Sequence, residues 1–190
     1  MADIARRAEV DAMIATVAQR CGRLDILVNN AAVRHEEPFA DMAYAAWRTA
    51  FDVCVDGAFH CTQAALPLMR KGGAGTVVNI GGMTAHSGAS RRAHVVAAKA
   101  ALAGLTRALA HELADFGITV NCIAPGMIDT VRQGAGAAAD PAHRAGHATL
   151  LGRRGHPDEI ASAVVWLAGP GARFTTGQTL HINGGAYLGV

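Results

Sequence analysis

Residues 75–105 read G-T-V-V-N-I-G-G-M-T-A-H-S-G-A-S-R-R-A-H-V-V-A-A-K-A-A-L-A-G-L, and this stretch decides the fold class. The β-branched apolar run at 76–80 follows a Gly-rich turn, which predicts a fully buried strand of a parallel sheet. The glycine pair at 81–82 ends that strand. A polar loop follows, and then a long helix to Leu113 that carries Lys99 in its middle.

Further strands and helices are predicted on both sides of this unit. Apolar runs that predict strands stand at 24–30, 118–124 and 176–183. Helical spacing of apolar residues predicts helices at 7–20, at 39–70 with a break near Gly57, and at 157–168. Gly22 and Pro157 are typical of a helix end and a helix start. The alternation predicts an α/β fold in a single domain that spans 1–190.

Composition and charge exclude several classes of protein. The formal net charge of +2 and the scattered arginine pairs predict a solvated surface rather than a nucleic-acid interface. No apolar run reaches the length of a membrane span and no secretion signal is present, so we expect a cytoplasmic protein. The four cysteines form no C-x-x-C pair, and we expect reduced packing residues and no metal site.

The strand, loop and lysine helix resemble the short-chain dehydrogenase/reductase (SDR) family. In that family the strand ends at a serine, and the next helix carries Tyr-x-x-x-Lys thirteen residues further on. Lys99 matches the lysine, which places Val95 at the tyrosine position and Gly82 at the serine position. A third family residue, an asparagine that holds a proton-relay water at a helix kink, is replaced by Cys54.

Two further motifs carry the resemblance. L-V-N-N-A-A at 27–32 is similar to the family's N-N-A-G, with Ala32 in place of glycine, and P-G-M-I-D-T at 125–130 is similar to its P-G-x-x-x-T. The resemblance extends from Asp3 to Gly185 and implies a Rossmann-like, doubly wound parallel sheet. It also implies contacts with a dinucleotide from Asp3, Asn29, Ala31, Lys99, Pro125, Gly126, Ile128 and Thr130, and a substrate lid at about 131–150.

The resemblance covers the C-terminal two-thirds of the family fold. The Gly-rich turn and the first strand–helix units, roughly 60 residues at about 30 per unit, are not matched, so Met1 is expected to be a truncated or misassigned start. We therefore expect NAD or NADP binding only in a full-length form. We also expect the 25–30 strand to leave an exposed apolar edge.

The residues at the matched catalytic positions do not specify a reaction. Val95 and Gly82 supply neither an acid nor a hydroxyl, and a general acid is worth about 10²–10⁴ in rate. His94 and His86 are candidate substitutes because histidine titrates near neutral pH. Three hypotheses remain open: an impaired NAD(P)-dependent oxidoreductase acting on a carbonyl or alcohol, a catalytically silent homologue with a binding or assembly role, and non-redox chemistry in the same pocket.

Small residues fill the lysine helix, and they allow close approach either to its own sheet or to a second subunit. The resemblance implies a homodimer or tetramer built on this helix and the preceding one. The expected partners are therefore a small-molecule substrate and further copies of the chain, without nucleic acid or membrane.

Overall fold

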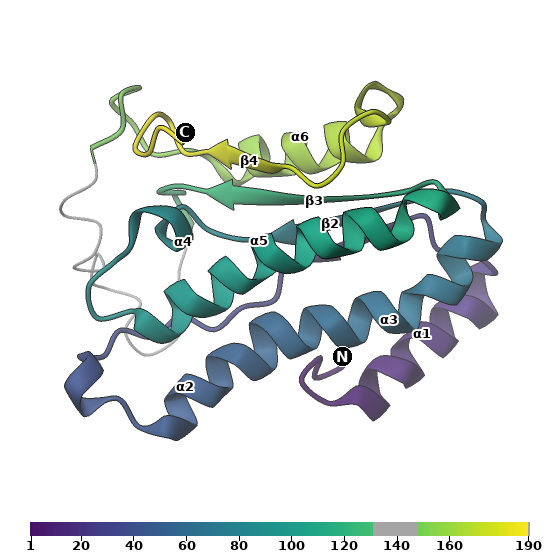
Figure 1. The fold of residues 1–190 in the computed structure, drawn as a ribbon, viewed down its shortest axis with the longest axis horizontal. Helices are drawn as coiled ribbons and strands as arrows, with labels where there is room; N and C mark the ends of the chain where they lie inside the picture. Colours follow the sequence, from purple (N-terminus) through teal and green to yellow (C-terminus); the bar gives the residue numbers. More distant parts are fainter. Residues whose placement is uncertain (131–147, 190) are drawn as a thin grey trace.

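The structure, a computed structural model, describes residues 1–130 and 148–189. Its centre is a four-stranded parallel sheet whose strands lie side by side in chain order (Figure 1). The strands are β1 (Ile26–Asn29), β2 (Gly75–Ile80), β3 (Ile118–Pro125) and β4 (Thr179–Ile182). Most of the lid expected at 131–150 lies outside the described residues.

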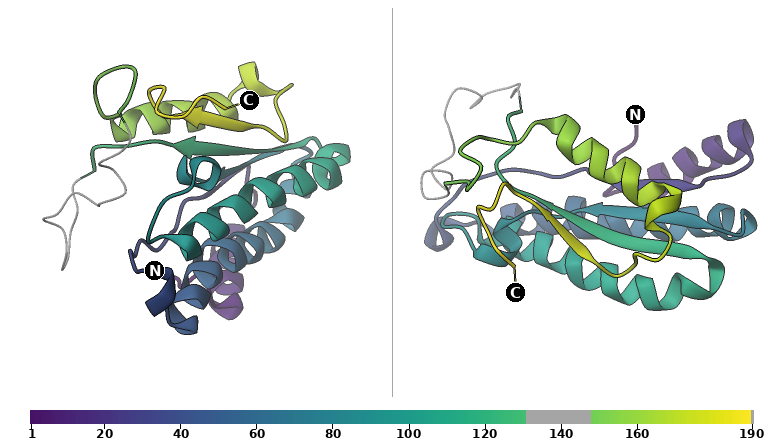
Figure 2. Two further views of the ribbon diagram at one scale, coloured as in Figure 1. Left: turned by 60° about the vertical axis from the view of Figure 1, so that its left-hand side comes forward. Right: turned by 90° about the horizontal axis from the view of Figure 1, so that it is seen from above.

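Helices cover both faces of the sheet, as the Rossmann-like prediction requires. Helices α1, α3 and α5 lie on one face and α6 lies on the other (Figures 1 and 2). The α-helices are α1 (Arg7–Cys21), α2 (Tyr44–Phe51), α3 (Gly57–Lys71), α4 (Thr84–Ser87), α5 (Ala93–Leu113) and α6 (Pro157–Ala168). The predicted fold class is confirmed.

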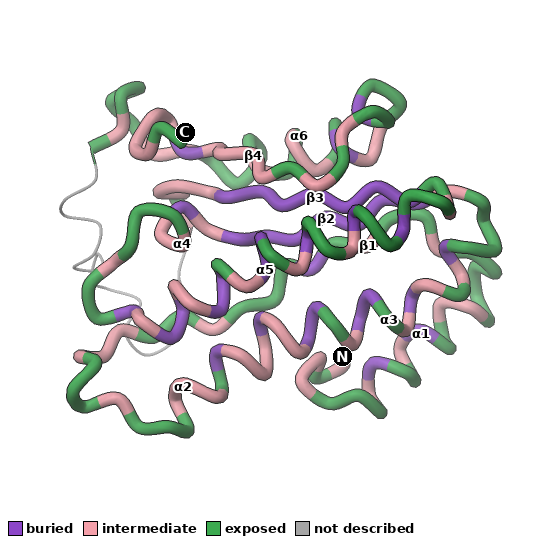
Figure 3. The backbone as a smooth tube through the Cα atoms, in the orientation of Figure 1, coloured by how far each residue is buried: buried purple, intermediate pink, exposed green. Residues whose placement is uncertain are grey.

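Strand β2 is buried along its whole length, and β3 is buried up to its last residue, Pro125 (Figure 3). Successive side chains of a strand point to opposite faces, so one strand contributes to two cores. Val77 and Val120 pack with α1, α3 and α5, whereas Val78 and Ile123 pack with α6. The continuous apolar runs in the sequence are explained by this burial on both faces.

Local signals set the ends of the helices. Gly22 closes α1 in the left-handed conformation with φ of 70°, as predicted. Before α6, the His156 side chain accepts a hydrogen bond from a backbone N–H, and the Glu159 carboxylate accepts one from the His156 N–H. Hydrogen bonds from Arg153 and from this N–H lower the pKa of Glu159 to about 2.

The helical region at 39–70 begins later than predicted and is broken where predicted. A separate 3₁₀ turn, η1 (Phe39–Asp41), precedes α2, and the break near Gly57 is a π-helical turn, η2 (Asp52–Asp56). Gly57 keeps a helical φ of −61°. A Cβ at Gly57 would lie 2.5 Å from Cδ1 of Ile4, so any larger residue here requires the Ile4 side chain to move.

Large apolar side chains stand at helical spacing from Trp47 to Leu66, but they do not form the buried face of α2 and α3. The core-facing residues are small or flexible: Ala50, Cys54, Ala58, Cys61, Ala65 and Met69. The larger side chains of the stripe are only half-buried, and Phe59 is 47% exposed. Small residues form the inner face because they allow α2 and α3 to approach the sheet and α5 closely.

Strand β1 forms one edge of the sheet, with β2 as its partner. Ile26 is 45% exposed and Val28 is 39% exposed, although strand side chains of this type are usually buried. The expected exposed apolar edge is confirmed.

Candidate functional site

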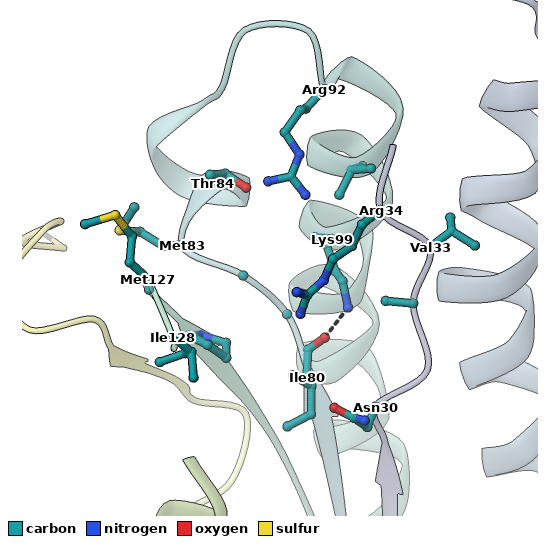
Figure 4. A pocket seen from close by; sticks show the side chains of 16 residues that line it. Asn30, Val33, Arg34, Ile80, Met83, Thr84, Arg92, Lys99, Met127 and Ile128 are labelled. Atoms are coloured by element: carbon teal, nitrogen blue, oxygen red, sulfur yellow. Dashed lines mark hydrogen bonds between the residues drawn. The ribbon is translucent and has the colours of Figure 1, made fainter. Parts of the chain in front are cut away.

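A cavity of about 140 Å³ opens at the carboxyl ends of β1, β2 and β3. Ligands of open α/β sheets bind at this end of the strands. Figure 4 shows the side chains that line it. The lining residues are Asn30, Ala32, Val33, Arg34, Ile80, Gly81, Gly82, Met83, Thr84, Arg92, Val95, Lys99, Pro125, Gly126, Met127 and Ile128.

Lys99 is held inside this cavity. Its side chain is buried, with the residue only 7% exposed, and its Nζ donates a hydrogen bond to the Ile80 carbonyl oxygen at 2.5 Å. Ile80 is the last residue of β2, so the bond ties α5 to the end of the central sheet. Burial lowers the pKa of Lys99, the thiols of Cys54 and Cys122 oppose this effect, and Arg34 and Arg92 add to it. Lys99 therefore faces the cavity rather than extending along the surface to solvent.

The two positions of the missing hydroxyls border the same cavity. Val95 is 3% exposed and lies one helical turn before Lys99, on the same side of α5. A Cβ built on Gly82 would meet no heavy atom within 4 Å, so this position faces open space. The positions that the resemblance matches to the family's serine and tyrosine therefore line the same cavity as Lys99, and the side chains present there donate no proton.

Cys54 lies in the π-helical turn, at the kink that the resemblance implies. Its side chain packs against Ala50 and Ala98 and is 2% exposed. Among the described residues it does not line the cavity. A π-turn in this position widens the helix locally, as such turns do at many functional sites.

The two histidines named as substitute acids lie away from the cavity lining. His94 is 1% exposed, and neither of its ring nitrogens has a hydrogen-bond partner among the described residues. Burial lowers the pKa of His94, and His35, whose ring centre lies 6.2 Å away, lowers it further. Adjacent helical residues point about 100° apart, which turns His94 away from the direction of Val95.

His86 belongs to a different cluster. It is exposed on α4, and its ring meets the ring of His181 edge-on, with the centres 4.6 Å apart. Tyr187 packs against both histidines. Burial lowers the pKa of His181, and its proximity to His86 adds to the effect. This cluster joins α4 to β4 and the C-terminal turn.

The residues matched to cofactor contacts divide into two groups. Pro125, Gly126 and Ile128 line the cavity beside Lys99. Asp3, Asn29, Ala31 and Thr130 do not line it, although Asn30 and Ala32 next to Ala31 do. The Asp3 carboxylate instead accepts a hydrogen bond from the Ala5 N–H.

Asn29 belongs to a buried network of side-chain hydrogen bonds. Its Nδ2 donates to the Asn79 side-chain oxygen at 2.8 Å and to the Thr62 hydroxyl at 3.1 Å. Asn79 in turn donates to the hydroxyl of Thr106 at 2.9 Å. This buried chain of polar groups connects β1, β2, α3 and α5 beneath the cavity.

The turn at the end of β3 approaches β4 closely. A Cβ on Gly126 would lie 2.6 Å from Cα of Asn183. Backbone atoms cannot give way as the tip of a side chain can, so glycine is required here. This contact fixes the Pro125–Gly126 turn over the cavity.

Sequence reasoning missed two cationic side chains of the site, Arg34 and Arg92. Arg92 stands three residues before Val95 and seven before Lys99, which is the spacing of one helical face. Arg34 lies on the segment that leaves β1. This spacing could have identified Arg92 as a cavity residue from the sequence. No such pattern marks Arg34, because its position beside the cavity depends on the course of the irregular segment after β1.

Comparisons with known proteins agree with this geometry. The family model described as "Enoyl-(Acyl carrier protein) reductase" matches residues 1–187. The uncharacterized oxidoreductase YohF of Escherichia coli is 45% identical over 171 residues, which is 90% of this chain and 67% of that protein. The 3-oxoacyl-[acyl-carrier-protein] reductase FabG of Vibrio harveyi is 38% identical over 94% of this chain and 73% of its own length.

The solved structures give the same result. A crystal structure of a short-chain dehydrogenase/reductase, described as a glucose/ribitol dehydrogenase, from Brucella melitensis superposes with a TM-score of 0.86 at 34% identity. It covers 99% of this chain, which spans 74% of that one. The chain belongs to the short-chain dehydrogenase/reductase family of oxidoreductases.

The described residues lack two further features. No helix in 1–130 or 148–189 has the length and apolar character needed to cross a membrane. The same part of the chain holds no cluster of three or more metal-ligating side chains. Cys54, Cys61 and Cys122 are buried free thiols, as expected for packing residues, whereas Cys21 is exposed.

Proposed function

We propose that this protein is a divergent NAD(P)-dependent oxidoreductase that acts on a small carbonyl or alcohol substrate, with impaired proton transfer. The observation that carries the proposal is the placement of the Lys99 ammonium in a cavity at the carboxyl ends of the strands, beside the Pro125–Gly126 turn. Family membership supports the same class of reaction.

The residues present fit the nicotinamide half of a dinucleotide. The cavity floor at Gly81 and Gly82 carries no side chain, so a flat group can approach the backbone. Lys99 offers a buried donor for a ribose hydroxyl, and Ile128 offers an apolar contact. The cofactor, when bound, supplies the hydride.

Reduction of a carbonyl also requires a proton and stabilisation of the oxygen that gains negative charge. Val95 and Gly82 cannot provide either, whereas Lys99, Arg92 and the Thr84 hydroxyl lie around the same space. Cationic groups in a partly dry site stabilise a developing oxyanion. Proton delivery then falls to a water molecule, which is a poorer acid than the family's tyrosine.

The missing hydroxyls also favour a second candidate, a catalytically silent homologue with a binding or assembly role. Restoring them separates the two candidates. Gly82→Ser is sterically admissible because its Cβ faces open space, and Gly104→Ser is a matched control because its Cβ also meets nothing within 4 Å. The assay follows nicotinamide absorbance with ethyl acetoacetate and NADH or NADPH.

The assay uses the chain itself and a chimaera in which the Gly-rich strand–turn–helix segment of a relative precedes Met1. We expect Gly82→Ser with Val95→Tyr to raise the rate by about 10²–10⁴, the worth of a general acid. Adding Lys99→Met should remove the gain, and Gly104→Ser should have no effect. An unchanged rate in the double variant would contradict the reductase and favour the silent or non-redox candidate.

We also propose a homo-oligomer. The half-buried apolar stripe on α2 and α3, which includes Trp47, Phe51 and Phe59, is more exposed than a core face. Such a stripe supports contact with a second copy of the chain. Light scattering after size exclusion measures the mass, and a monomer at micromolar concentration would contradict the proposal.

A further inference from the structure

Three aromatic rings from separate parts of the chain pack together at one end of the sheet. His86 lies on α4, His181 on β4 and Tyr187 on the turn that follows β4. The centre of the His181 ring lies 4.6 Å from that of His86, in an edge-on contact, and 5.1 Å from that of Tyr187. Figure 1 shows α4 and the turn after β4 at the same end of the sheet. The rings therefore form one contact between α4 and the C-terminal part of the chain.

The half-buried His181 ring is held in a form that favours its neutral state. Leu180 and Ile182 pack toward α6, so the side chain between them points to the opposite face of the sheet, on which α5 lies. A Cβ built on Gly189 would lie 3.4 Å from Nε2 of His181, so the chain also covers the ring from this side. Nδ1 of His181 is buried and has no hydrogen-bond partner among the described residues. A protonated imidazole carries an N–H on both nitrogens, and the one on Nδ1 would be buried without an acceptor.

Among the described residues, no carboxylate offsets a charge on this ring. Burial lowers the pKa of His181 and the charge of His86 lowers it further, and no other charged group changes it. The titratable and charged groups on the elements around the ring are His86 on α4, Tyr187 on the turn, Cys122 on β3, Lys99 and Arg107 on α5, and Glu159 of α6, which pairs with Arg153 on the other face of the sheet. Protonation of both histidines would therefore place two positive charges in contact.

Helix α4 forms part of the cavity wall. It begins with Thr84, and both Met83 and Thr84 line the cavity. The Met83 N–H donates a hydrogen bond to the Pro125 carbonyl oxygen at 2.9 Å, which ties the start of α4 to the end of β3. The helix is a single turn of four residues, and so short a helix is not stable by itself. Its position therefore depends on what it packs against, including the ring of His181.

We propose that His181 is a positioning residue of this site, and that its protonation releases α4 from the end of the sheet. The neutral ring holds His86, and with it Met83 and Thr84, in place beside the cavity. The protonated ring is repelled by a protonated His86 and has no acceptor for its buried N–H, so the contact opens and the ring reaches water. The effect on turnover rests on the proposed function, whereas the opening itself does not.

The direction of the pH dependence follows from the lowered pKa of His181. In the open state the ring regains the ordinary pKa of about 6.5, so the open state binds more protons below that pH. The contact is therefore fully formed above about pH 6.5 and weakens as the pH falls. Because one proton is taken up on opening, the opening constant can rise by at most about tenfold per pH unit.

Amide hydrogen exchange of the full chain, measured by mass spectrometry, tests the opening of α4. The N–H groups of 85–88 donate hydrogen bonds within this turn, so their exchange reports its opening. After correction for the intrinsic effect of pH on exchange, we expect protection of 85–88 to fall about threefold or more between about pH 7.5 and about pH 5.5. The amides of α1 are the internal reference and should keep their protection. Equal protection of 85–88 at both pH values would overturn the proposal.

Three variants assign the effect to the ring contact. His181→Gln should remove the dependence of this protection on pH, and retention of the wild-type change would overturn the proposal. His86→Ala should lower the protection already at about pH 7.5, although alanine is the best helix former, because the ring contact is lost. Because His86 is exposed, this variant is expected to fold even where His181→Gln does not, and wild-type protection in His86→Ala would also overturn the proposal. His111→Gln, on the exposed surface of α5, is the matched control and should change neither value.

The outcome is independent of the reductase assay. Opening of α4 that depends on pH and on His181, combined with no turnover of any ketone, would keep the positioning role and reject the oxidoreductase. Turnover of ethyl acetoacetate by the Gly82→Ser, Val95→Tyr variant, combined with protection of α4 that does not change with pH, would keep the oxidoreductase and reject the role of His181.

Discussion

Replacing Asn79 by alanine removes the centre of the buried polar chain beneath the cavity. Asn79 is fully buried, accepts a hydrogen bond from Asn29 at 2.8 Å and donates one to Thr106 at 2.9 Å. The Thr106 hydroxyl in turn donates a hydrogen bond to the Leu102 carbonyl oxygen at 2.8 Å. The substitution therefore removes the side-chain hydrogen bonds that link β2 to β1 and to α5, one residue before Ile80.

The expected loss follows from these contacts. Two hydrogen bonds contribute about 1 kcal/mol each, and a buried donor left without one partner adds about 1–3 kcal/mol. We expect Asn79→Ala to lower the free energy of unfolding by about 3–5 kcal/mol, a large fraction of the roughly 5–15 kcal/mol typical of a domain. Thr106→Val removes two bonds, the one accepted from Asn79 and the one donated to the Leu102 carbonyl, and leaves the buried Asn79 amide without that acceptor, so it should cost about 2–4 kcal/mol.

Urea denaturation measures both effects as a shift of the midpoint at constant slope. Thr16→Val is the matched control, because the Thr16 hydroxyl also donates to the carbonyl four residues earlier but lies on the exposed side of α1. It should change stability by less than about 0.5 kcal/mol. The reasoning is refuted when Asn79→Ala costs less than 1 kcal/mol, or when Asn79→Ala and Thr106→Val add without a coupling energy of about 0.5 kcal/mol or more.

Three further outcomes are expected. Gly126→Ala should destabilise by about 1–3 kcal/mol through a backbone clash, while Gly82→Ala, which faces open space, should cost far less; equal midpoints would contradict the close approach. The pKa of His94 is lowered in the folded state, so the unfolded state binds more protons as pH falls below about 6.5 and the free energy of unfolding decreases there. His94→Gln should flatten this dependence of stability on pH, whereas His111→Gln, on the exposed surface, should not. Parallel curves of stability against pH for the wild type and His94→Gln would reject the assignment. Val28→Lys on the β1 edge should slow aggregation measured by light scattering at an unchanged circular dichroism spectrum, and unaltered aggregation would reject the exposed edge as its cause.

Most of the sheet could be predicted from local sequence. The run at 76–80 is apolar and β-branched because β2 is buried on both faces, and the strand at 118–124 follows the same rule. Helix ends at Gly22 and Pro157 were predictable because the left-handed conformation and the first helical turn each select one residue type.

The helices at 39–70 were predicted less well. The large residues Trp47, Phe51 and Phe59 share one helical stripe, which is typical of either a core face or a dimer interface. The small residues around Cys54 and Ala58 face the core. Helical periodicity identifies an apolar stripe, but it does not show whether the stripe packs against the sheet, another helix or a second copy of the chain. The close approach of helix and sheet, which selects small side chains, is a tertiary property.

The sequence by itself determined the family scaffold: the apolar runs that form the parallel strands, the lysine in mid-helix, and residues without a hydroxyl at Gly82 and Val95. These features are local, since they depend on residue type and spacing along one chain segment. Only the tertiary structure decided which groups share the cavity. It placed Arg34 and Arg92 around Lys99 and left His94 and His86 outside the lining, because direction from a helix and the path of a loop are set by packing between distant segments.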